Sequence, residues 1–227
     1  MSAKYAPKGD FGRAVNEIEE TAIAILLGLM TVLTFVNVVL RYVFNHSIIW
    51  GLEATLMLFA WLVIFGISYA VKVTAHLGVD AVIGALPHRG QRVLALISAL
   101  ACLLYAVLML KGAWDYWAPF AGLDQTTGRI FPTGFDASTR DRAFYVTEQI
   151  PFPAFLSFLE GLVNQGEAYD KLPRFIPYAM LPFGLGLFLF RTVQASIELL
   201  RGEREGLIVS HEAEDAIEDV RHMNYED

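Results

Sequence analysis

The sequence predicts an all-α integral membrane protein with four transmembrane helices. Of its 227 residues, 55% are hydrophobic and only 18% are charged, which is well above the apolar share of an ordinary soluble domain. Four long apolar runs stand between polar or charged segments. A water-soluble globule is therefore excluded. The lone Cys102 excludes an intrachain disulfide, a four-cysteine zinc site and a Cys-x-x-Cys redox pair.

The first transmembrane helix is predicted over residues 21–44, after a cytoplasmic N-terminal segment, 1–20. Residues 21–40 are 20 uncharged positions, and at about 1.5 Å rise per residue they reach about 30 Å, the thickness of the hydrocarbon layer. The run is too long for the apolar region of a signal peptide and no small-residue cleavage site follows it. We therefore expect this helix to remain as a membrane anchor.

The second and third transmembrane helices are predicted over residues 50–72 and 91–112. Their centres, 54–71 and 93–110, are 18 uncharged residues each and have polar or charged flanks. Between them, residues 75–88 alternate apolar and polar side chains over a length too short to cross a bilayer. This segment is expected to be an amphipathic helix that lies in the cytoplasmic membrane interface.

The rest of the chain is predicted to contain a long periplasmic loop with short helices, 113–173, a fourth transmembrane helix, 174–198, and an acidic cytoplasmic tail, 199–227. The fourth apolar run has 16 uncharged residues before Arg191, whose long stem would let the charge snorkel to the interface. The last 25 residues hold nine acidic and two basic side chains, and the remainder of the chain is balanced. The net charge of −7 therefore belongs to the tail.

The distribution of basic residues predicts cytoplasmic N and C termini. The first 20 residues and the segment 72–92 each hold three Lys or Arg, whereas the connection 45–53 holds none. Short loops rich in Lys and Arg stay in the cytoplasm. No strongly basic stretch indicates nucleic acid as a partner.

The histidines do not indicate a cofactor or metal centre. His46 and His76 are expected at opposite ends of the second helix, so they cannot be the two axial ligands of one haem. Asp80 follows His76 by four residues on one helix face, where a structural or partner contact is favoured over a two-ligand metal site. There is also no phosphate-binding loop. We therefore expect no catalytic residue, cofactor or metal, and no enzyme activity.

Charged and small residues at the helix ends and faces indicate packing sites. Arg41 and Glu53 flank the connection between the first two helices, where they either pair with one another or anchor separately in the interface. Asn37 lies one turn before Arg41 and is predicted to hydrogen-bond across helices. Small residues at helical spacing predict close helix contacts, within this chain or with another protein. They are Gly66 and Ala70 in the second helix and Ala95, Ala99, Cys102 and Ala106 in the third.

The stretch from residue 37 to residue 87 resembles the small membrane subunit (Q subunit, DctQ family) of tripartite ATP-independent periplasmic (TRAP) transporters. The segments NVVLRYVFNHSIIWGLE, LFAWLVIFGISYAVK, HLGVD and LP carry the resemblance. Two positions depart from it, because Leu52 stands where the family often has a second acid and Lys72 stands where arginine is common. The matching positions are Asn37, Arg41, Tyr42, Asn45, Trp50, Glu53, Trp61, Gly66, His76, Asp80 and Pro87.

The resemblance implies a scaffold in the bacterial inner membrane that braces a large M-type membrane subunit. That subunit would carry an organic acid together with sodium, and a C4-dicarboxylate is the favoured solute. A P-type periplasmic binding protein would deliver the solute. The aromatic loop 113–173 would help to dock the binding protein, and membrane lipid would surround the helices. The expected interface residues are Asn37, Arg41, Trp50, Glu53, Trp61, Gly66, Lys72, His76, Asp80 and Arg191.

Two other classes of function remain open at this point. One is a subunit of a membrane-bound redox enzyme. The other is a membrane tether whose acidic tail binds cytoplasmic partners, although acidic blocks of this kind are more often solvated and disordered.

Overall fold

Among the residues that the structure describes, four helices are long and apolar enough to cross a membrane, which confirms the four predicted transmembrane helices. The computed structural model describes residues 10–72, 87–132, 134, 145–164 and 166–202. The expected interfacial helix 75–88 and the tail lie largely outside these ranges. The spanning helices are α1 (Asp10–Val43), α2 (Gly51–Lys72), α4 (His88–Trp117) and the pair α7 (Phe175–Tyr178) and α8 (Met180–Arg201).

Helix α1 begins at Asp10, well before the expected start at residue 21, so much of the expected N-terminal segment is helical. Its 34 residues correspond to about 51 Å, more than the hydrocarbon thickness. Helix α8 likewise extends past residue 198, to Arg201. It stops where Gly202 adopts φ 73°, a left-handed conformation that suits glycine at a helix C-terminus.

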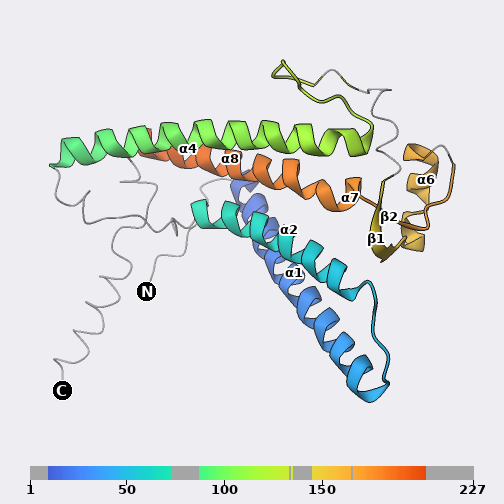
Figure 1. The fold of residues 1–227 in the computed structure, drawn as a ribbon. Helices are drawn as coiled ribbons and strands as arrows, with labels where there is room; N and C mark the ends of the chain where they lie inside the picture. The colour runs from blue at the N-terminus through green and yellow to red at the C-terminus, as the bar shows by residue number, and fades with distance from the viewer. Residues whose placement is uncertain (1–9, 73–86, 133, 135–144, 165, 203–227) are drawn as a thin grey trace, which may run out of the picture.

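The helices are arranged as two antiparallel pairs, α1 with α2 and α4 with α8 (Figure 1). The pairs splay apart, and α2 also packs against α8. Residues 44–50 and the connection from α4 to α7 lie at one end of the helices, which we call the loop end.

The small residues of α4 pack against α8 within the chain. Ala99 and Ala106 are buried with Phe188 and Ala195, and Ala95 and Cys102 pack against the same cluster. The small residues of α4 were predicted to pack either within this chain or against another protein, and this contact shows that they pack within the chain. Elsewhere on the helices many large apolar side chains are exposed, including Val32, Leu100 and Leu104, as expected for a surface that faces hydrocarbon.

A small β-sheet that the sequence did not predict lies at the loop end. Strands β1 (Val146–Pro151) and β2 (Lys171–Pro173) pair antiparallel and are joined through the short helices η3 (Ala154–Leu156) and α6 (Phe158–Val163). Strands of six and three residues that end in proline give little periodic signal. The sheet packs through Ile150 and Leu172 against Ala54 of α2.

Candidate functional site

The connection between α1 and α2 is held by Asn37. Its side-chain oxygen Oδ1 accepts a hydrogen bond from the backbone N–H of Ile48 at 3.0 Å. Asn45 adopts φ 51°, in the left-handed region that asparagine tolerates better than most residues, and closes the end of α1. Asn37 therefore fixes the turn between the two helices, whereas the sequence had predicted a contact between helix faces.

Glu53, in the first turn of α2, binds the backbone of β1. Its carboxylate accepts hydrogen bonds from the N–H groups of Glu148 at 2.9 Å, Gln149 at 2.7 Å and Ile150 at 3.2 Å. Arg41 is exposed and forms no ion pair with Glu53, although the structure describes both residues. Of the two alternatives for Arg41 and Glu53, the structure therefore does not show the pair, because the carboxylate of Glu53 accepts hydrogen bonds from three backbone amides instead.

Replacing Glu53 with glutamine is expected to loosen β1, because the amide NH₂ that replaces one carboxylate oxygen cannot accept a hydrogen bond. Hydrogen bonds to a charged group contribute about 1.5–3 kcal/mol, so the amides of residues 148–150 should exchange with deuterium many times faster. Hydrogen exchange followed by mass spectrometry measures this. Glu167→Gln, at an exposed position of the same connection, is the matched control, and equal protection in both variants would contradict the role of Glu53.

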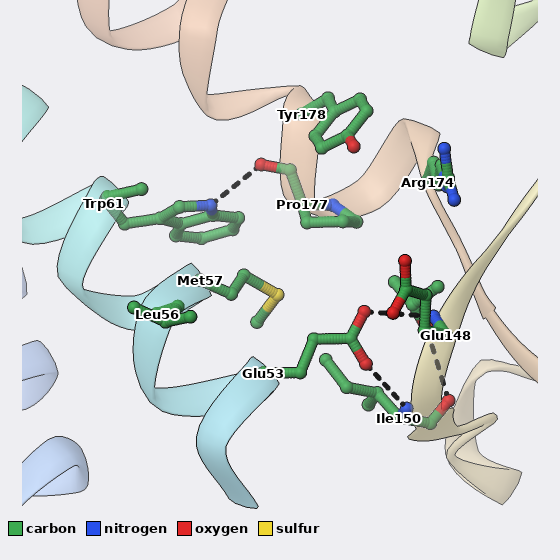
Figure 2. Close-up of a pocket in the computed structure, with 11 residues that line it drawn as sticks. Glu53, Leu56, Met57, Trp61, Glu148, Ile150, Arg174, Pro177 and Tyr178 are labelled. Atoms are coloured by element: carbon green, nitrogen blue, oxygen red, sulfur yellow. Dashed lines mark hydrogen bonds between the residues drawn. The ribbon is translucent and has the colours of Figure 1, made fainter. Parts of the chain in front are cut away.

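A pocket of about 390 Å³ opens beside Glu53, between α2, β1 and α7 (Figure 2). Trp61 closes one side of it and donates an indole N–H hydrogen bond to the carbonyl of Pro177 at 2.8 Å. Pro177 lies in α7, close to the start of α8, and Trp61 lies in α2. This hydrogen bond therefore links the α1–α2 pair to the α4–α8 pair. Trp50, also predicted as an interface residue, packs against the cluster of Ala54, Ile150 and Leu172.

Gly66 is not a site of close helix approach within the described part of the chain, because a Cβ added to it would meet nothing within 4 Å. A close contact of Gly66 with another protein stays a prediction. The close approach is at Gly184 of α8, where an added Cβ would lie 1.9 Å from Ile64 Cγ2. Lys72 ends α2, while His76 and Asp80 lie outside the described residues.

Arg191 is buried rather than snorkelling to the interface. Its guanidinium Nη2 lies 2.5 Å from Glu19 Oε2, and the two side chains are 1% and 0% exposed. Ser68 of α2 donates to Glu19 Oε1 at 2.8 Å, and Arg191 Nη1 donates to Gln194 at 2.9 Å. The snorkelling prediction is wrong because the extension of α1 brings a carboxylate to the arginine. Sequence reasoning missed Glu19, although its place at one end of the first apolar run and the place of Arg191 in the fourth could have suggested a shared depth.

Comparisons with known proteins show the family of this chain. Residues 30–133 match the family model described as the DctQ component of tripartite ATP-independent periplasmic transporters. The chain is 42% identical over 210 residues to a C4-dicarboxylate TRAP transporter small permease protein DctQ of Vibrio cholerae serotype O1, covering 92% of this chain and 83% of that protein. It is 28% identical to a protein of the same description from Pseudomonas aeruginosa, covering 92% of this chain and 95% of that protein.

Proposed function

This chain belongs to the DctQ family of TRAP transporters, and from that premise we propose that it is the small membrane subunit of an importer for C4-dicarboxylates. The observation that carries the proposal is the 42% identity to the Vibrio cholerae DctQ protein over 92% of the chain. The relatives are permease subunits of transporters, which confirms the prediction that the chain is not an enzyme. It is a multi-pass protein of the inner membrane.

The subunit acts as a scaffold for the large membrane subunit, which carries the solute with sodium. Ionisable groups inside a membrane face either the interior of the helix bundle or a water-filled cavity, and those on a solute or ion path must be reachable by the solute. Within the described helices, Glu19 and Arg191 pair with each other and are both closed off from solvent. This arrangement favours a bracing role over a solute path through the chain.

The termini are cytoplasmic and the loop end is periplasmic, as the basic residues of the sequence predict. The periplasmic binding protein would then approach the face that carries β1, β2 and α6. Ile130, Phe131 and Phe155 are each more than 75% exposed at this end, and exposed apolar side chains of this kind suit a docking surface.

The test is uptake of radiolabelled succinate by cells that lack the native transporter. Expressing this chain with its large subunit and binding protein should restore sodium-dependent uptake, whereas the chain alone, or the two partners without it, should not. Sialic acid and a monocarboxylate of similar size serve as competitor controls. Uptake by the partners without this chain would contradict the scaffold role, and competition only by a different class of acid would contradict the assigned solute.

A further inference from the structure

The pocket beside Glu53 carries one acid and one base that no described residue neutralises. Glu148 and Arg174 both line it (Figure 2). Among the described residues, the Glu148 carboxylate has no hydrogen-bond or ion-pair partner, because Glu148 contacts Glu53 and Lys171 only through its backbone. Arg174 uses Nε to donate to the Val146 carbonyl at 2.9 Å, and its two terminal nitrogens have no described partner.

Two hydrogen bonds hold Arg174 in place. The backbone N–H of Arg174 donates to the carbonyl of Tyr145 at 2.8 Å, and its side-chain Nε donates to the carbonyl of the next residue, Val146. Glu148 is anchored through its backbone only, because its N–H donates to Glu53, and its exposed carboxylate can turn toward a ligand. The guanidinium of Arg174 is therefore the preorganised group, and a preorganised group loses less entropy when a ligand binds.

The wall of the pocket on α2 is apolar and continues onto the surface of the helix. Leu56, Met57 and Trp61 lie on it, and the distance from Glu53 to Trp61 along the helix is about 12 Å. One face of α2 is exposed at helical spacing over most of its length and starts at the mouth of the pocket. The residues of this face are Leu52, Leu56, Phe59, Val63 and Ile67, which are 40–70% exposed.

We propose that this pocket binds a membrane phospholipid whose headgroup carries a primary ammonium. The phosphate would accept charge-assisted hydrogen bonds from the terminal nitrogens of Arg174, whose planar fork matches a phosphate. The ammonium would donate to Glu148, and one acyl chain would lie along the exposed face of α2. The volume of about 390 Å³ falls within the range of roughly 300–1,000 Å³ typical of small-molecule sites.

Other ligands fit the pocket less well. A dicarboxylate would meet two carboxylates, Glu53 and Glu148, for one guanidinium. A water-soluble peptide would not bury itself against the apolar wall of the pocket, because this wall belongs to a membrane-spanning helix. An anionic lipid without an ammonium would leave Glu148 unpaired, and a quaternary ammonium has no N–H to donate to it.

Native mass spectrometry of the purified protein, offered equal amounts of phosphatidylethanolamine, phosphatidylglycerol and phosphatidylcholine, tests this site. The wild type should retain phosphatidylethanolamine selectively. Glu148→Gln and Arg174→Gln should each weaken the retention of this lipid about tenfold or more, because losing one charge-assisted hydrogen bond lowers the affinity by about this factor. Glu167→Gln and Arg92→Gln, at exposed positions away from the pocket, should retain the lipid as the wild type does.

Hydrogen exchange at residues 148–150 shows whether β1 keeps its contact with Glu53 in each variant. Equal retention of the three lipids, or undiminished retention by Glu148→Gln with this contact intact, would overturn the proposal. Binding of free phosphoethanolamine without binding of the whole lipid would also overturn the proposal, because the exposed face of α2 would then not contribute to the site. A cross-linker at residue 148 that captures only the periplasmic binding protein would assign the pocket to a protein partner instead.

Discussion

Replacing Arg191 with methionine should lower the free energy of unfolding by about 3–5 kcal/mol, the range seen when one partner of a buried ion pair is removed. Glu19 is fully buried and would keep only the hydroxyl of Ser68 as a described partner. A carboxylate left without its counter-charge between membrane helices has a large desolvation cost. Thermal unfolding in detergent, followed by tryptophan fluorescence, measures the loss.

Two further variants separate the pair from the effect of charge alone. Arg201→Met removes an exposed arginine from the same helix and should leave the unfolding midpoint nearly unchanged. The double variant Glu19→Leu with Arg191→Met replaces the pair by apolar groups, which is often neutral or stabilising. It should therefore recover most of the stability. A double variant less stable than Arg191→Met alone would show that Glu19 is stabilised by groups other than the arginine.

Gly184→Ala should destabilise the contact between α2 and α8 by about 1–3 kcal/mol, the usual cost of overpacking. The new methyl group would lie 1.9 Å from Ile64 Cγ2 and 2.9 Å from Met180 Cε. The methionine is flexible enough to move, but the β-branched isoleucine has few rotamers in a helix. The loss should exceed the gain of up to about 1 kcal/mol that alanine brings to a helix interior.

Gly186→Ala is the matched control, since an added Cβ there meets nothing within 4 Å. Its unfolding midpoint should be unchanged or slightly raised. Combining Gly184→Ala with Ile64→Ala removes the clashing methyl group and should return part of the lost stability. If Gly184→Ala and Gly186→Ala behaved alike, the close approach of the two helices would not be a constraint on residue 184.

The sequence was sufficient to predict the four spanning helices because each rests on a local property, a run of 16–20 uncharged residues. The small residues of α4 could be recognised as a packing face because their helical spacing is also a local property, but the sequence did not identify α8 as the partner helix. The contacts of Glu53, Glu19 and Gly184 depend on residues 95, 172 and 120 positions away in the chain, and no periodic pattern encodes such pairs. The sequence could not decide whether Arg41 and Glu53 pair, because proximity along the chain was the only basis for that alternative.

The ion pair of Glu19 with Arg191 spans 172 residues of the chain. At a synthesis rate of roughly 5–20 residues per second, the ribosome needs about 10–30 s to make the arginine after the glutamate. During this interval α1 already holds an acidic group at the edge of its apolar run, with no counter-charge from α8. The buried ion pair can therefore form only after the last helix has been made, so the packing of α1 against α8 is completed late in the synthesis of the chain.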